Sequence, residues 1–243
     1  MNQDANAMDR TTSTTLPADA GLRRPAGSTT ATGALAADAG RVLRNTYALL
    51  AMTLLFSAGA AAASVTWRLP APGMLLTLAG YFGLLFAIHR LRNSALALPA
   101  VFALTGFMGY TLGPLLSQLL AIPAGTQVVG LAVGATGVTF LALSAFALLT
   151  RRDLGFLGGF LFAGMIVALV AALAAAFFEL PTLATVVSAA VALLSAGLIL
   201  YETSRIVNGG ETNYVLATVS LYVSIFNLFV SLLQLLGLGG SDE

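Results

Sequence analysis

From about residue 45 onward the sequence is a succession of long apolar runs with short breaks, a pattern that very few folds can accommodate. A run of about 20 apolar residues crosses the ~30 Å hydrocarbon core of a bilayer as one α-helix. Lipid offers the backbone no hydrogen bonds, so a spanning run has to satisfy its own. Seven runs qualify, at residues 45–66, 74–90, 95–120, 127–149, 156–178, 182–205 and 214–237. The sequence therefore predicts an all-α integral membrane protein, a bundle of seven transmembrane helices.

Composition agrees with this prediction, because only 9% of the residues are charged and 58% are hydrophobic. In soluble domains roughly a quarter of the residues are charged. The third run contains Gly113-Pro114, where we expect a kink or a break. In the fourth run, Gly130 and Gly134 have the small-xxx-small spacing that lets two membrane helices approach closely, so we expect them to pack inside the bundle.

The basic residues predict the orientation. The chain has no lysine, and its arginines cluster beside one side of the predicted bundle: Arg41, Arg44, Arg90, Arg92, Arg151, Arg152 and Arg205. On the opposite side this count finds only Arg68. Short cytoplasmic segments of membrane proteins carry the excess of Lys and Arg. We therefore expect a multi-pass protein of the bacterial inner (plasma) membrane with its N-terminus in the cytoplasm.

The segments outside the apolar runs complete the predicted organisation. Residues 1–40 are small, polar and aperiodic, and they lack the basic start and apolar core of a signal peptide. We expect a disordered cytoplasmic tail at 1–40, a membrane domain at 41–237 and a short C-terminal tail at 238–243. The C-terminus lies outside if the seventh run crosses fully, and inside if that run is re-entrant.

The seventh run carries a narrow polar seam along an otherwise apolar helix. Its polar residues recur at steps of four, three, four and three, namely Ser220, Ser224, Asn227, Ser231 and Gln234. The sixth run has a polar stripe of its own, made of Thr185, Ser188, Ser195 and Glu202. Lipid would leave these groups poorly satisfied. We therefore expect the two stripes to face each other and the seventh helix to be central.

Glu202 is the only acidic residue firmly inside a predicted span. A carboxyl group within a membrane helix is costly, and the default interpretation is a functional site. Arg205 follows on the same helical face, so the alternative is a solvated Glu–Arg pair at the membrane interface. Position alone leaves both interpretations open.

The chain offers little for catalysis or for tight metal binding. It has no cysteine and a single histidine, His89, which ends the second run beside Arg90. The absence of cysteine excludes disulfides, and one histidine without cysteine is too few ligands for a typical transition-metal site. No serine stands in a nucleophile-elbow motif, and no glycine-rich phosphate loop is present. We predict a non-enzymatic protein without catalytic residues, a metal or another cofactor.

The C-terminal part carries a resemblance to a known family. The stretch YETSRIVNGGETNY at 201–214, followed by ATVSLYVSIFNLFVSLLQLLG, resembles the Bax inhibitor 1 family and, within it, a bacterial inner-membrane branch. Residues 41–47, 106–114 and 150–159 match that branch as well. The resemblance covers about residues 41–237. It implies a fold in which six helices surround a central seventh.

This resemblance implies two alternative functions, one from each of two branches of the family. The bacterial branch implies a partner and modulator of FtsH, the membrane-anchored ATP-dependent protease, which would engage a flexible tail within residues 1–40. Another branch implies a pH-sensitive calcium or proton leak. Its gate pairs an acid on helix six with an acid on helix seven, and a base at the end of helix two exchanges partners with them. We expect the FtsH modulator, with the cation leak as the alternative and a purely structural membrane protein as a third possibility.

Carried over by position, the helix-six acid is Glu202 and the base is Arg90 or Arg92. The helix-seven acid falls on Ser224, so the acid pair is missing, and we expect a pH switch of that kind to be weak or absent. Counted from the turn before helix seven, Ser220 lies nearer the depth of Glu202 than Ser224 does. With Asn227 and Arg205, these residues form the predicted polar interior or gate.

Overall fold

The computed structural model describes residues 27–239 of the 243-residue chain, with side chains described for residues 39–237. Within that part it contains seven helices and no strand: α1 (Gly27–Thr66), α2 (Met74–Leu91), α3 (Ala97–Leu120), α4 (Gly125–Thr150), α5 (Gly155–Phe177), α6 (Pro181–Val207) and α7 (Tyr214–Gly239). All seven are long and apolar enough to cross a membrane. The predicted seven-helix membrane bundle is confirmed.

Two local features concern the expectations made from sequence. α3 continues through Pro114 to Leu120, so of the kink or break expected at Gly113-Pro114 the structure contains no break. α1 begins at Gly27, inside the segment 1–40 that we expected to be irregular. Once a membrane helix is nucleated, each further residue adds one hydrogen bond, and the alanines at 34, 36 and 37 favour this extension. Residues 1–26 and 240–243 lie outside the described residues, and the predicted division into tails and a membrane domain stays a prediction.

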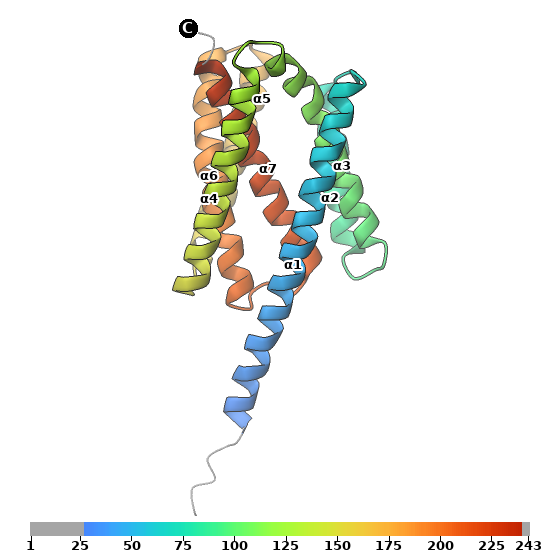
Figure 1. Cartoon of the computed structure of the whole chain (residues 1–243). Coiled ribbons are helices and arrows are strands. Elements are labelled where there is room, and N and C mark those ends of the chain that lie inside the picture. The colour runs from blue at the N-terminus through green and yellow to red at the C-terminus, as the bar shows by residue number, and fades with distance from the viewer. Residues whose placement is uncertain (1–26, 240–243) are drawn as a thin grey trace, which may run out of the picture.

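α7 is the central helix. In its most apolar window 56% of the residues are buried, compared with 39% in α3 and fewer in the others. It packs against α1, α3, α4 and α6, whereas α2 packs mainly on α3 and α5 on α6. Figure 1 shows α7 running obliquely between α1–α3 on one side and α4–α6 on the other. The ring around the central helix is therefore incomplete.

α1 and α3 form the closest contact between helices that are not consecutive in the chain, because glycines of α3 face α1. A Cβ atom at Gly109 would collide with the Ser57 carbonyl oxygen, and one at Gly113 would collide with the Ser64 side chain. Small residues of this kind let two backbones approach in lipid. The Tyr222 hydroxyl then ties α7 to both helices: it lies 2.7 Å from Ser57 Oγ and donates to the Thr105 carbonyl oxygen at 3.3 Å.

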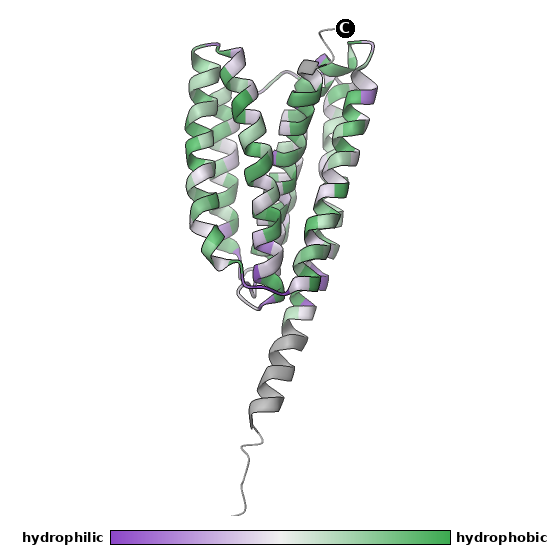
Figure 2. Cartoon of the chain, turned by 90° about the vertical axis from the view of Figure 1, so that its left-hand side faces the viewer, coloured by the Kyte–Doolittle hydropathy of each residue, from purple (hydrophilic) through white to green (hydrophobic). Residues whose placement is uncertain are grey.

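One end of the bundle collects the arginines, and we call it the arginine-rich end. It comprises the end of α2, the α4–α5 connection and the α6–α7 turn, with Arg90, Arg92, Arg151, Arg152 and Arg205. In Figure 2 the hydrophilic colour gathers near this end, while hydrophobic residues cover most of the helix lengths. Within the described residues, Arg68 is the basic residue of the opposite end, just after α1. This division matches the sidedness expected from the sequence.

Candidate functional site between α6 and α7

Glu202 lies on α6, close to the helix end at Val207. Its Oε2 atom is buried and has no hydrogen-bond partner among the described residues. The Ser224 hydroxyl of α7 lies beside this carboxyl group and donates its own proton to the Ser220 carbonyl oxygen at 3.0 Å. Glu202 therefore faces the bundle interior, and the residue opposite it on α7 is a serine rather than an acid.

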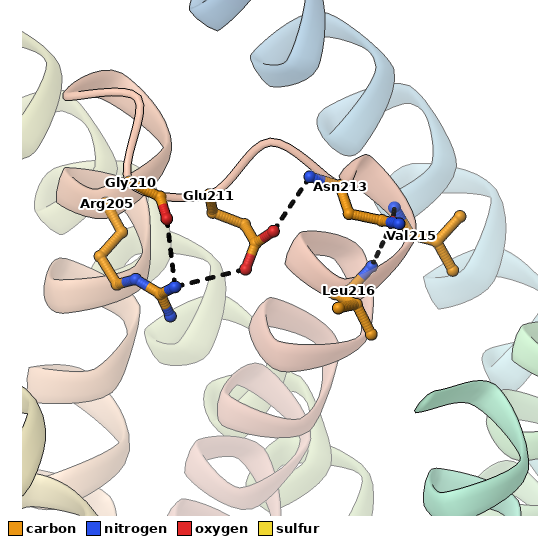
Figure 3. Close-up of polar contacts among 6 residues, drawn as sticks. All are labelled: Arg205, Gly210, Glu211, Asn213, Val215 and Leu216. Atoms are coloured by element: carbon orange, nitrogen blue, oxygen red, sulfur yellow. Dashed lines mark hydrogen bonds and ion pairs between the residues drawn. The ribbon is translucent and has the colours of Figure 1, made fainter. Parts of the chain in front are cut away.

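The guanidinium of Arg205 is occupied by the turn that follows α6. It forms an ion pair with Glu211 at 3.4 Å and donates to the Gly210 carbonyl oxygen at 3.3 Å (Figure 3). It also lies over the Tyr201 ring, 5.6 Å from the ring centroid. The ion pair is half exposed, so it contributes little free energy. The partner of Arg205 is thus Glu211, and the solvated Glu202–Arg205 pair considered above is not what the structure contains.

Asn213 joins the turn to α7 and to the α2–α3 connection. Its Oδ1 atom accepts the backbone N–H groups of Val215 and Leu216 at 3.0 and 3.2 Å, which caps α7 (Figure 3). Its amide nitrogen donates to the Arg92 carbonyl oxygen at 3.2 Å and to Asn93 Oδ1 at 3.3 Å. One side chain therefore starts the central helix and holds a neighbouring loop.

The α4–α5 connection is fastened to the same turn. Ser204 Oγ donates to the Arg152 carbonyl oxygen at 2.6 Å, and the Asn208 amide donates to that oxygen at 3.1 Å. The connection begins with Arg151 in the left-handed conformation (φ 49°), which ends α4 sharply. The three connections at the arginine-rich end are thus hydrogen-bonded into one unit.

The arginines carried over from the leak branch lie apart from the acid. The side chains of Arg90 and Arg92 are exposed at the end of α2. The hydrogen bond that reaches α7 from this place comes from the Arg92 carbonyl oxygen, not from its guanidinium. The group of α2 that lies near Glu202 is instead the phenol of Tyr81. The structure therefore brings Glu202 and Ser224 together and leaves both arginines outside.

The polar seam of α7 is only partly enclosed. Ser224 and Ser231 are buried, Asn227 is half-buried, and Ser220 and Gln234 are exposed. Gln234 nevertheless meets the stripe of α6, because Ser188 Oγ donates to its Oε1 at 2.6 Å. The expectation that all five face the interior is wrong for Ser220, since four helices rather than six line α7. The two polar stripes do face each other at both ends of the α6–α7 contact.

Several buried hydroxyls elsewhere in the bundle have no hydrogen-bond partner among the described residues: Thr46, Tyr47, Ser144, Ser195 and Thr203. They come from α1, α4 and α6, and all but Ser195 lie in the half of the bundle nearest the arginine-rich end. Buried polar groups normally find a partner in protein or water. Among the residues with described side chains, no three His, Cys, Asp or Glu side chains lie together as a metal site would require. Each of these hydroxyls, like the Glu202 carboxyl group, can hydrogen-bond a water molecule.

The seven spans, the buried central α7 and the polar contact between α6 and α7 define a polytopic all-α membrane protein. Residues 39–241 match the family model described as inhibitor of apoptosis-promoting Bax1. The chain belongs to the Bax inhibitor 1 family.

Relatives from several bacteria match over nearly their whole length. A protein of Escherichia coli strain K12 named modulator of FtsH protease YccA is 50% identical over 202 residues, 83% of this chain and 92% of that protein. A protein of Escherichia coli O6:H1 named inner membrane protein YccA matches with the same identity and coverage. An uncharacterised protein of Pseudomonas aeruginosa is 52% identical over 202 residues, 83% of this chain and 91% of its own.

Sequence reasoning missed the residues that fasten the arginine-rich end. Asn213 could have been found, because an Asn directly before an apolar helical run is the usual signal of a helix N-cap. Ser204 and Asn208 gave no such signal, since their partner is a backbone carbonyl group in a distant loop. The Tyr222–Ser57 contact was also missed, because nothing in the pattern of α1 distinguishes Ser57 from its other small residues.

Proposed function

We propose that the protein is an inner-membrane partner and modulator of the ATP-dependent protease FtsH. One observation carries this proposal: a relative named modulator of FtsH protease is 50% identical over 92% of its own length. A similarity that spans the whole bundle supports a shared role better than a match to one motif would. The second Escherichia coli relative, named an inner membrane protein, supports the same location.

The arginine-rich end supports a mode of action. Its three connections are short and hydrogen-bonded to one another through Asn213, Ser204 and Asn208. A protease that pulls substrates by their flexible ends finds no loose loop in this unit. We propose that FtsH first engages residues 1–26, which precede α1 and are polar in sequence, and we call this segment the handle. The protease would engage the handle, would extract the bundle slowly and would be occupied meanwhile. This mode requires the arginine-rich end to be cytoplasmic, as the arginine count favours.

Co-purification tests the partnership. The full chain, expressed with an FtsH variant that hydrolyses ATP but not peptides, should be retained with the protease after mild solubilisation. An excess of the chain should also slow degradation of a second membrane substrate by active FtsH. An absence of FtsH in the purified material, together with unchanged degradation of that substrate, would overturn the proposal.

Deleting residues 2–26 tests the handle separately. The truncated chain keeps Arg41, Arg44 and the first span, so it should insert with the same orientation. It should become long-lived in cells with active FtsH, whereas the full chain turns over in a pulse-chase experiment. Equal, protease-dependent lifetimes of both chains would show that the segment is only a linker, and the partnership itself would stand.

A cation or proton leak is the second candidate, and the buried oxygen of Glu202 favours it. The charged and titratable groups that act on Glu202 are Arg205, Glu211 and Tyr81; none of them is an acid on α7. We therefore expect little flux through vesicles that contain the protein, and no steep pH midpoint between about pH 5 and 8. A large flux that Glu202→Gln and Ser224→Ala abolish, and that the exposed Ser220→Ala leaves unchanged, would favour the leak over the protease modulator.

A further inference from the structure

A cavity of about 600 Å³ opens between α1 and α4, in the half of the bundle away from the arginine-rich end. Its walls come from α1, α3 and α4, and its floor is α7. Figure 1 shows α7 behind the space between α1 and α4, two helices that do not pack on each other. The volume falls within the range of ligand pockets, about 300–1,000 Å³.

Small residues create this cavity. Ala58 and Ala62 line it from α1, and Gly137 lines it from α4. A Cβ atom at Gly137 would meet nothing within 4 Å, so the space in front of it is open. The floor is formed by larger side chains of α7, among them Phe226 and Phe229. Small side chains therefore leave space between α1 and α4, and large side chains of α7 close that space on the inside. The cavity is a groove and not a hole through the bundle.

The hydroxyls that line the groove have no free hydrogen-bond donor for a polar ligand. The hydroxyls of Ser57 and Tyr222 bond to each other at 2.7 Å. Thr136 Oγ1 donates to the Ala132 carbonyl oxygen at 2.7 Å, and Thr66 Oγ1 donates to the Ala62 carbonyl oxygen at 2.8 Å. All four hydroxyls that line the groove thus have partners inside the protein. What remains for an occupant is van der Waals contact, which selects a hydrocarbon.

The shape of the groove fits one extended chain. Along α1 it runs from Leu54 to Thr66, twelve residue steps that span about 18 Å at 1.5 Å per residue. An extended acyl chain can lie along a groove of this length.

The open end of the groove has the residues expected at a lipid headgroup. Thr66, which ends α1, lines the groove, and it is followed directly by Trp67 and Arg68. Trp67 is 73% exposed, and tryptophan favours the interface between hydrocarbon and headgroups. Within the described residues Arg68 is the basic residue of this end of the bundle, so it offers a positive charge to a phosphate group.

We propose that the groove between α1 and α4 is a lipid site that holds one acyl chain of a phospholipid, from the leaflet opposite the arginine-rich end. The chain lies on Phe226 and Phe229 of the central helix, and its phosphate group lies near Trp67 and Arg68. The site is independent of the Glu202–Ser224 contact and of the proposed partnership with FtsH.

Fluorescence quenching by lipids brominated on the acyl chain tests the site in vesicles of phosphatidylcholine. Trp67 is the only tryptophan of the chain, so Trp67→Phe gives a silent background. Phe229→Trp in that background reports on the floor of the groove, and Phe226→Trp serves if the first variant folds poorly. Brominated vesicles should quench this reporter strongly, compared with vesicles of the unbrominated lipid.

Gly137→Leu fills the groove, and Gly134→Leu is its matched control. Both glycines lie on α4, and neither would bring a Cβ atom within 4 Å of another group, but only Gly137 lines the groove. Gly137→Leu should reduce the quenching by at least about half, because the new side chain occupies the volume of the acyl chain. Gly134→Leu should leave the quenching unchanged. An unquenched reporter, or equal quenching in the two leucine variants, would overturn the proposal.

Discussion

Replacing Asn213 with alanine should destabilise the bundle more than any other single change in the α6–α7 turn. The side chain makes four hydrogen bonds: two cap the N-terminus of α7, and two hold the α2–α3 connection through Arg92 and Asn93. Asn213 itself is half-buried, so water replaces the lost partners only in part.

The expected size follows from the two functions of the side chain. Removing an N-cap costs typically about 1 kcal/mol. Each hydrogen bond to the loop contributes about 0.5–1.5 kcal/mol, and both lie near water, so we take the lower figure for each. Asn213→Ala should therefore lower the free energy of unfolding by about 2 kcal/mol. Asn213→Asp keeps the cap and loses the donors to Arg92 and Asn93, so it should cost about 1 kcal/mol.

Reversible unfolding in mixed micelles, followed by circular dichroism, measures both variants against the unchanged chain. Thr212→Ala is the control, because Thr212 is exposed and lies next to Asn213 in the same turn. The reasoning predicts the order Asn213→Ala, Asn213→Asp, Thr212→Ala from most to least destabilised. An aspartate variant as unstable as the alanine variant would show that the cap contributes nothing, and two neutral variants would refute the whole account of the turn.

Three further changes test the packing around the central helix. Tyr222→Phe removes the hydroxyl that joins α7 to Ser57 and to the Thr105 carbonyl oxygen, and should cost about 1 kcal/mol in the same unfolding assay. Gly109→Ala should destabilise by about 1–3 kcal/mol, because its Cβ atom collides with the α1 backbone at Ser57; a neutral result would mean that α1 and α3 separate easily. Gly59→Ala on α1 is the matched change in open space, so it should be neutral or slightly stabilising, and a cost like that of Gly109→Ala would contradict the collision argument.

The positions of the helices could be predicted from sequence because hydrocarbon allows the backbone so few alternatives. The run expected at 74–90 is α2 (Met74–Leu91), and the run expected at 182–205 is α6 (Pro181–Val207). The extension of α1 back to Gly27 could not be predicted in this way. Outside the membrane a polar segment satisfies its backbone equally well as coil or helix, so hydropathy carries no information about it.

Glycine patterns show why packing was harder to predict than the spans. Gly130 and Gly134 on α4 have the spacing of a close helix contact, yet a Cβ atom at either would meet nothing within 4 Å. Gly109 and Gly113 on α3 have the same spacing and do form the contact with α1. The spacing only removes a steric obstacle. Which glycine face meets a neighbour depends on how each helix is rotated in the bundle, and hydropathy does not determine that rotation when most faces are apolar.

The residue opposite Glu202 illustrates the same limit at the candidate site. Counting equal distances from the turn pointed to Ser220, whereas the structure places Ser224 beside the carboxyl group, one helical turn further along α7. The count assumes that both helices start level and run parallel. Instead, residues 211–213 are not helical, so α7 begins only at Tyr214, and the helix crosses the bundle obliquely (Figure 1). The corrected register strengthens the functional argument. By the resemblance, Ser224 is the position expected to carry the second acid of the leak branch, and it is the position that lies beside Glu202.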